Sequence, residues 1–219
     1  MFRACLLPAL LLFVSSMASS ADAPAFPSTP EGIRPILLGT AMPDVALSTP
    51  AGKATTLAKA VDGKPAILVF YRGGWCPYCN LQLSELRLIE DEAETLGYQM
   101  IAISPDSPAS LSETLGKTPL DYTLLSDSSA AALHAFGIGF RVDDATIEKY
   151  KGYDIDLEAA SGASHHALPV PSVFIVDGDG KLQFSYVHPD YRLRVPGSVI
   201  LAAARAIAER KQYLTPPRG

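Results

Sequence analysis

A run of six apolar residues, 66–71, is followed directly by a cysteine pair and then by an amphipathic stretch. The run reads Ala-Ile-Leu-Val-Phe-Tyr between Pro65 and Gly73, which predicts a β-strand buried on both faces of a sheet. Downstream, apolar residues recur at spacings of three and four as far as Gly97, which predicts a helix with one buried face. This order indicates an α/β chain, with helices on both faces of a mixed central sheet.

Further strand and helix patterns follow at short intervals. Short strands are expected after residue 42, with turns at 49–53 and 62–64, and a later hairpin is expected to turn at 177–180, where glycines favour tight turns. The other predicted strands cover 98–103, 122–125, 172–176 and 181–187, and predicted helices include 129–135 and 199–212, the last with Val199, Ala203 and Ile207 on one face. Residues 142–167 interrupt this pattern, because they are rich in Asp, Gly, Ser and His without an apolar face. We interpret them as an insertion or long loop within one domain of residues 36–214.

The N-terminus has the pattern of a secretory signal. One positive charge at Arg3 precedes an apolar run over 6–14, and small residues follow up to Ala21, which predicts a signal peptide over 1–21 and a mature chain that starts at Asp22. The apolar run is shorter than the ~20 residues that span a bilayer, so no stable membrane insertion is expected after cleavage. Residues 22–35 are rich in proline and are predicted to be a mobile lead-in. We expect a periplasmic or secreted protein.

Composition excludes two classes of protein. With 48% apolar and 19% charged residues, the chain can form a core and does not have the composition of an intrinsically disordered protein. The net charge is −5, and no run of lysine and arginine reaches four residues. A nucleic-acid partner is therefore not expected.

Removal of the signal peptide leaves two cysteines, Cys76 and Cys79, separated by Pro77 and Tyr78. Pro77 suits the first turn of a helix, so Cys76 is expected at the helix N-terminus, where the dipole favours a thiolate. Cys79 would lie on the same helix face, within reach of a disulfide. This predicts a redox dithiol; a static disulfide is the alternative. Zinc is disfavoured because no second ligand pair is present, and no metal or cofactor is expected.

The motif Trp75-Cys-Pro-Tyr-Cys79 after an apolar strand resembles the thioredoxin superfamily, in the form that glutaredoxins use. The segment 170–182 resembles that superfamily's second hallmark, and this resemblance implies a cis bond at Val170–Pro171 facing the cysteines. The layout over residues 36–212 is most similar to the peroxiredoxin branch, the alkyl hydroperoxide reductase/thiol-specific antioxidant group. The resemblance implies a thioredoxin-like fold.

The chain departs from the peroxiredoxin signature Pro-x-x-x-Thr-x-x-Cys. Alignment places Arg72 at its proline, Cys76 at its threonine and Cys79 at its peroxidatic cysteine, while the family's active-site arginine falls on Pro171. Donors aimed at the peroxide oxygens would have to come from elsewhere, and Arg72 and Arg141 are the candidates that the sequence offers.

The candidate catalytic residues are therefore Cys76 and Cys79. Position at the helix terminus and expected exposure favour Cys76 as the nucleophile, whereas the resemblance favours Cys79. We expect Cys76, because a side chain one turn into the helix is less accessible and less stabilised by the terminal N–H groups. Trp75, Arg72 and Pro171 are the candidate substrate- or partner-facing residues. The loop that contains Tyr191, Arg192 and Arg194 is expected to be solvated, and a substrate-facing loop is the alternative.

The resemblance implies an exported, peroxiredoxin-like enzyme that reduces hydroperoxides with electrons from a thioredoxin-type protein. One alternative is a periplasmic thiol–disulfide oxidoreductase that acts on protein disulfides. The other is a copper-binding assembly factor, since a relative in the superfamily uses two cysteines and one histidine. The histidines considered for that role are His134, His165 and His188. The neighbouring residues His165 and His166 are expected to be a solvated pair rather than a metal site.

Overall fold

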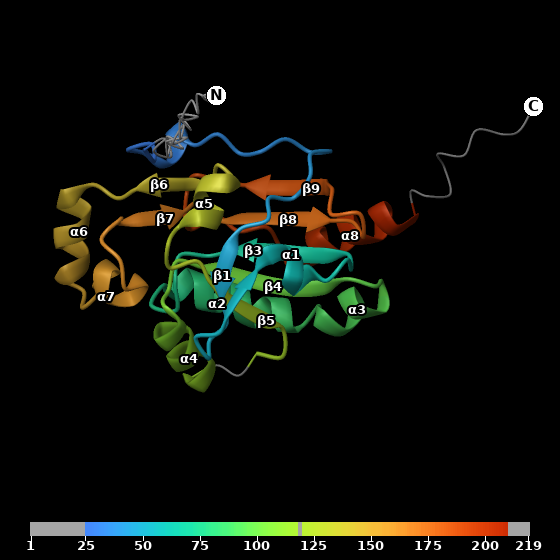
Figure 1. Cartoon of the computed structure of the whole chain (residues 1–219), viewed down its shortest axis with the longest axis horizontal. Helices are drawn as coiled ribbons and strands as arrows, with labels where there is room; N and C mark the ends of the chain where they lie inside the picture. Colours follow the sequence, from blue (N-terminus) through green and yellow to red (C-terminus); the bar gives the residue numbers. More distant parts are fainter. Residues whose placement is uncertain (1–24, 118–119, 210–219) are drawn as a thin grey trace, which may run out of the picture.

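The computed structural model describes residues 25–117 and 120–209 of the 219-residue chain (Figure 1). The predicted signal peptide, the start of the lead-in and the end of the last predicted helix lie outside the described residues. Within the described ranges, no helix is both long enough and apolar enough to cross a membrane.

A seven-stranded mixed sheet forms the centre of the molecule. Its strand order is β2-β1-β5-β4-β3-β8-β9. The strands span Ala46–Ser48 (β1), Ala54–Thr56 (β2), Ala66–Phe70 (β3), Gln99–Ser104 (β4), Thr123–Ser126 (β5), Ser172–Val176 (β8) and Leu182–Val187 (β9). Strand β4 is parallel to β3 and β5, whereas β8 pairs antiparallel with β3 and β9. The predicted mixed sheet is confirmed, and every residue of β3 is buried.

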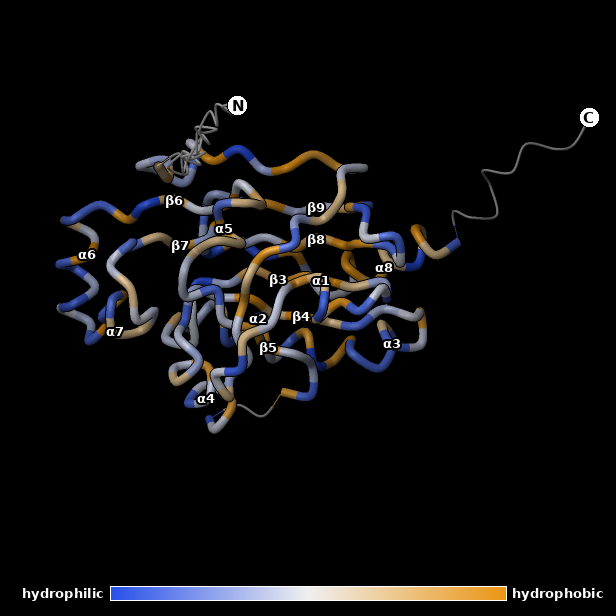
Figure 2. The backbone as a smooth tube through the Cα atoms, viewed as in Figure 1, coloured by the Kyte–Doolittle hydropathy of each residue, from blue (hydrophilic) through white to orange (hydrophobic). Residues whose placement is uncertain are grey.

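Helices cover both faces of the sheet, as predicted. Alternate residues of β3 point to opposite faces, so Ile67 and Val69 join one apolar cluster while Leu68 and Phe70 join the other. The first cluster includes side chains of α2 (Pro77–Arg87), α3 (Glu90–Thr95), α4 (Pro108–Lys117) and α8 (Gly197–Glu209). The second includes side chains of α1 (Leu57–Val61) and α5 (Ala131–Ala135). Figure 2 shows the apolar strands running through the interior between these layers.

Two predicted helices differ in detail. The helix expected to continue to Gly97 is divided into α2 and α3 around Leu88, whose side chain is exposed. The apolar spacing continues across this break because Ile89 still packs on the core. Two residues of the predicted face of the last helix, Ala203 and Ile207, pack against the core. The third, Val199, is exposed, and Ile200 and Leu201 are buried instead.

Residues 142–167 are not the long loop that their composition indicates. They contain α6 (Asp144–Lys151) and α7 (Leu157–Ser161), and a two-stranded ribbon of β6 (Gly139–Arg141) and β7 (Ala167–Pro169) flanks them. Asp143 and Asp156 accept hydrogen bonds at the starts of the two helices, which is the role of an N-cap. Val142, Ile147, Leu157 and Leu168 form a small core of their own. The segment, which we call the inserted segment, lies at one end of the sheet (Figure 1).

The described part of the lead-in is packed rather than mobile. A short 3₁₀ turn, η1 (Pro30–Gly32), precedes backbone hydrogen bonds from Arg34 to Gly137 and from Ile36 to Phe136. Gly137 has φ +65°, and a Cβ there would lie 1.9 Å from the Arg34 carbonyl oxygen. Only glycine permits this close approach, which ties the lead-in to the connection after α5.

Candidate active site

The cysteine pair lies where β3 gives way to α2. Cys76 is the N-cap of α2 in an extended conformation (φ −90°, ψ 113°), and Pro77 begins the helix, as the sequence predicts. The Cys79 amide donates to the Cys76 carbonyl at 3.0 Å, within the first turn. Both residues are free thiols, and they are only 2% and 0% exposed, respectively. The exposure expected for Cys76 is therefore wrong, because the sulfur is enclosed by the fold.

The two sulfurs have opposite electrostatic environments. The pKa of Cys76 is lowered from 9.0 to about 6, chiefly because the Cys79 thiol donates a hydrogen bond to its sulfur. Burial opposes this lowering, whereas the positive charges of Arg72 and Arg194 add to it. The pKa of Cys79 is raised, first by burial and then by its hydrogen bond to Cys76. The pair therefore holds its negative charge mainly on Cys76.

Arg72 is a buried cation beside this pair. Its side chain is 4% exposed, and its guanidinium carbon lies 5.2 Å, 5.5 Å and 4.5 Å from the ring centroids of Trp75, Tyr150 and Tyr191. Its Nη2 donates to the Tyr150 hydroxyl. In the described part of the chain, Nε has no hydrogen-bond partner, and no carboxylate forms an ion pair with the guanidinium. A buried donor left free in this way is suited to a ligand oxygen.

Arg194 reaches the second sulfur from the loop after β9. Its Nη2 lies 3.3 Å from Cys79 Sγ, and its Nη1 donates to Gln82 Oε1 at 3.1 Å. The solvated loop expected here is found at Arg192, which pairs with Asp190 on the surface, and at Tyr191, which is exposed. For Arg194 the structure favours the alternative, a loop that faces the site. The sequence could not identify its contact with Cys79, because 115 residues separate the two and no local pattern joins them.

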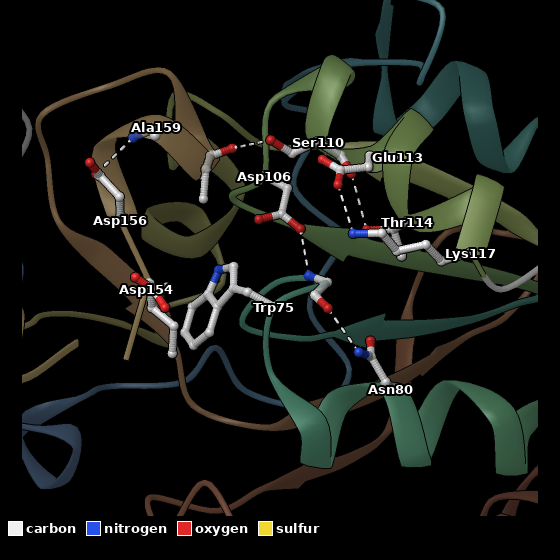
Figure 3. A pocket seen from close by; sticks show the side chains of 13 residues that line it. Trp75, Asn80, Asp106, Ser110, Glu113, Thr114, Lys117, Asp154, Asp156 and Ala159 are labelled. Carbon is white, nitrogen blue, oxygen red and sulfur yellow. Dashed lines mark hydrogen bonds and ion pairs between the residues drawn. The ribbon is translucent and has the colours of Figure 1, made fainter. Parts of the chain in front are cut away.

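Asp106, at the end of β4, supports the loop that carries the cysteines. Its carboxylate is buried and accepts a hydrogen bond from the Gly74 amide at 2.8 Å, as Figure 3 shows. Burial raises the pKa of Asp106 to about 6, and the charge of Cys76 adds to this effect. A cavity of about 380 Å³ opens beside it, between Trp75 and Thr114. A Cβ on Gly74 would lie 1.9 Å from Thr114 Oγ1, so this close packing requires glycine. Sequence reasoning did not single out Asp106.

Two candidates do not have their predicted roles. The Val170–Pro171 bond is trans rather than cis, since no described peptide bond is cis, and Pro171 is buried. Its carbonyl accepts from the His188 amide, so the segment enters β8 as part of the sheet. Arg141 is not a substitute donor, because it is exposed and pairs with Asp144 at 2.8 Å.

The histidines contact other parts of the fold. His165 Nδ1 accepts from the Ala167 amide, His188 stacks on Tyr186, and His134 packs edge-on against Phe26. Across residues 25–117 and 120–209, no three His, Cys, Asp or Glu side chains are grouped to hold a metal ion. His166 pairs with Glu158 at 2.8 Å.

The chain is similar to peroxiredoxins in both sequence and fold. It is 31% identical to a putative peroxiredoxin bcp of Haemophilus influenzae over 106 residues, which is 48% of this chain and 68% of that protein. It is 26% identical to peroxiredoxin Bcp of Escherichia coli over 169 residues, 77% of this chain and 96% of that one. Peroxidoxin BcpB of Mycobacterium tuberculosis superposes with a TM-score of 0.60 at 20% identity, covering 78% of this chain and 97% of that structure.

A family model described as the AhpC/TSA family matches residues 38–185, which include both cysteines, the strands from β1 to β8 and the start of β9. The chain therefore belongs to the AhpC/TSA family, in the peroxiredoxin-like branch of the thioredoxin superfamily, and is an enzyme of the thiol peroxidase type.

Proposed function

We propose that this protein is an exported thiol peroxidase that reduces hydroperoxides at the Cys76–Cys79 dithiol and is recharged by a thioredoxin-type protein. The observation that carries the proposal is the Cys76 sulfur itself. Its pKa is lowered, in part by the positive charge of the nearby Arg72. The Nε of Arg72 has no hydrogen-bond partner among the described residues. A nucleophilic thiolate and a donor for the peroxide oxygens are the two requirements of this chemistry.

In the first step, the Cys76 thiolate attacks one oxygen of the hydroperoxide and the O–O bond breaks. The leaving alkoxide takes a proton and departs as an alcohol, which leaves a sulfenic acid on Cys76. In the second step, Cys79 loses its proton and attacks the Cys76 sulfur. Water is released and a Cys76–Cys79 disulfide forms. A reduced dithiol of the partner protein then supplies two electrons by thiol–disulfide exchange.

The rate of this reaction depends on what replaces the family's threonine and arginine. Arg72 supplies positive charge to Cys76 and has a buried Nε without a partner, and Arg194 donates an N–H to the sulfur of Cys79. The hydroxyl donor of the signature is absent, since Cys76 stands in its place. Loss of one transition-state donor typically costs about 10²–10³ in rate, so we expect a slower enzyme than peroxiredoxins with the full signature.

Disulfide exchange with proteins is the second candidate function. The lowered pKa of Cys76 favours it. Cys76 is only 2% exposed in the reduced protein, and this burial limits the approach of a substrate protein and of a thioredoxin-type reductant alike. Burial therefore does not separate the two functions, and the comparison of peroxide and disulfide rates described below does. The copper alternative has no histidine beside the cysteines to support it among the described residues.

Export rests on the sequence pattern of residues 1–21. N-terminal sequencing of the protein from the periplasm or medium should begin at Asp22 or within a few residues of it. Recovery of intact Met1 in the cytoplasm would contradict this part of the proposal.

The peroxidase is tested by stopped-flow mixing of the reduced protein with hydrogen peroxide. Trp75, the only tryptophan of the chain, reports the reaction by its fluorescence. We expect oxidation faster than that of free cysteine, loss of the reaction in Cys76→Ser, and a trapped sulfenic acid in Cys79→Ser. Oxidation no faster than free cysteine, together with rapid reduction of a small disulfide, would favour the oxidoreductase function. Oxidation that survives Cys76→Ser but not Cys79→Ser would make Cys79 the peroxidatic residue.

A further inference from the structure

The thiol of Cys79 must lose a proton in the second step of the proposed reaction, although it is fully buried. In the reduced protein this thiol donates to the Cys76 sulfur, but that acceptor is no longer a thiolate once Cys76 carries a sulfenic acid. Arg194 donates to the Cys79 sulfur and cannot take the proton, because a guanidinium is a donor without an acceptor. The proton therefore needs another acceptor within the core.

The hydroxyl of Tyr71 is a buried polar group that the two steps above do not use. Tyr71 follows β3 and packs in the same apolar cluster as Cys79. Its side chain is 0% exposed, and in the described part of the chain its hydroxyl has no hydrogen-bond partner of ordinary geometry. Buried polar groups are rarely left in this state. A hydroxyl without a fixed partner can rotate, and it can both accept and donate a proton.

Tyr71 lies beside Ser104 at the carboxyl ends of two parallel strands, β3 and β4. The Tyr71 amide donates to the Ile103 carbonyl at 3.0 Å, which extends the register of the two strands by one residue. Burial and the charge of Asp106 raise the pKa of Tyr71. The Ser104 hydroxyl lowers this pKa, and the charge of Cys79 raises it. The tyrosine hydroxyl therefore interacts both with the buried thiol and with the side chains at the end of β4.

Asp106 connects this end of β4 to a cavity. The Ser104 hydroxyl, which is fully buried, accepts from the Asp106 amide at 3.3 Å. Burial raises the pKa of Asp106 to about 6, against the hydrogen bonds that its carboxylate accepts from the Gly74 amide and the Ser104 hydroxyl. The same carboxylate lines the cavity of about 380 Å³ (Figure 3). It can therefore exchange a proton with water there at a pH near neutral.

We infer that Tyr71, Ser104 and Asp106 form a path that carries the proton of the resolving thiol to the cavity. This inference deepens the proposed function and rests on it. As the Cys79 sulfur attacks Cys76, the thiol proton passes to the Tyr71 hydroxyl, which gives its own proton to Ser104. Ser104 in turn passes a proton to the Asp106 carboxylate, which releases it to water. The S–S bond forms as the S–O bond of the sulfenic acid breaks, and the departing hydroxide takes a proton from solvent and leaves as water.

The test removes one hydroxyl and follows the second step. Tyr71→Phe deletes an oxygen that has no partner, so the variant should fold. Tyr98→Phe makes the same change at a buried tyrosine before the opposite end of β4 and is the control. Hydrogen peroxide is added first, and dimedone at increasing delays measures the lifetime of the sulfenic acid on Cys76. This lifetime should lengthen by about tenfold or more in Tyr71→Phe and stay the same in Tyr98→Phe. An unchanged lifetime in Tyr71→Phe would overturn the path.

A second measurement uses the unmodified protein and separates proton transfer from packing. A path through two hydroxyls moves more than one proton, so the rate of disulfide formation should fall along a curve as the fraction of D₂O in the solvent rises. Asp106→Asn keeps an oxygen for the Gly74 amide but cannot take up a proton, so it should lengthen the sulfenic acid lifetime as well. A straight line, or no isotope effect, in the unmodified protein would overturn the path.

If the reduced protein does not react with hydrogen peroxide, the proposed peroxidase function fails instead. The path is then tested in the opposite direction, in which dithiothreitol opens the Cys76–Cys79 disulfide and Cys79 takes up a proton. Tyr71→Phe should slow this reduction, and Tyr98→Phe should not. Equal rates for the two variants would show that the proton does not pass through Tyr71.

Discussion

Replacement of Cys79 by alanine tests the origin of the Cys76 thiolate. The pKa of Cys76 is lowered by about three pH units, from 9.0 to about 6, and the hydrogen bond from Cys79 is the largest cause. The positive charges of Arg72 and Arg194 remain in the variant, so we expect the pKa to rise by roughly two units rather than fully. That rise corresponds to about 2.7 kcal/mol of lost thiolate stabilisation.

The rate of alkylation at one pH is a poor measure of this change. At pH 7 the thiolate fraction would fall by roughly tenfold, but a more basic thiolate is also a stronger nucleophile. With a Brønsted coefficient of ~0.4–0.5, nucleophilicity rises about six- to tenfold over two units. The two effects nearly cancel, so the midpoint of the pH profile is the quantity to measure.

The assay is therefore iodoacetamide alkylation of the reduced protein from pH 4 to pH 10, with peptide mapping of the labelled site. The midpoint for Cys76 should move from about 6 in the unmodified protein toward 8 in Cys79→Ala. Cys79→Ser retains a hydroxyl donor at the same position and should move it less. A midpoint that stays near 6 in Cys79→Ala, or predominant labelling of Cys79 in the unmodified protein, would refute the reasoning.

Three further predictions concern residues around the dithiol. Arg194→Met should slow the attack of Cys79 on the oxidised Cys76 and lengthen the lifetime of the sulfenic acid, measured by its reaction with dimedone. Arg192→Met, on the same loop, should not change this lifetime. Equal effects of the two variants would contradict a role for the 3.3 Å contact between Arg194 and the Cys79 sulfur. Tyr150→Phe should remove the hydrogen bond that holds the Arg72 side chain near Cys76. Because Arg72 helps to lower the pKa of Cys76, the midpoint of Cys76 alkylation should rise by a few tenths of a pH unit. An unchanged midpoint would show that the tyrosine hydroxyl does not position Arg72. The pKa of Asp106 is raised from 3.8 to about 6, so the stability linked to its protonation is fully present below about pH 4 and is lost as the pH rises through 6. Urea unfolding at pH 4.5 and 7.5 should show a smaller fall in stability with pH for Asp106→Asn than for the unmodified protein, and an unchanged fall would exclude this carboxyl as its cause.

The part of the site that the sequence predicts is the part built from neighbouring residues. Rules that apply to residues close together in sequence predict a buried strand, then a proline at the first helical position with a cysteine on either side of it. The structure confirms them in β3 and at the start of α2. The mixed sheet with helices on both faces follows from the order of the apolar patterns. The helices within residues 142–167 were not predicted, because short capped helices around a small core leave little periodic signal.

The side chains that surround the two sulfurs are brought together by tertiary contacts between distant parts of the chain. Arg194 and Tyr150 are far from the cysteines in sequence, yet one contacts Cys79 and the other holds Arg72. The sequence places Arg72 next to the motif but does not reveal that three aromatic rings bury it without a carboxylate partner. Secondary structure depends on periodicity within a few turns of chain, whereas burial, pKa and cavity shape depend on which distant side chains the fold brings together. For that reason the fold class, the dithiol and the preference for a thiolate on Cys76 follow from local sequence, whereas the burial of both sulfurs and the cations beside them follow from packing.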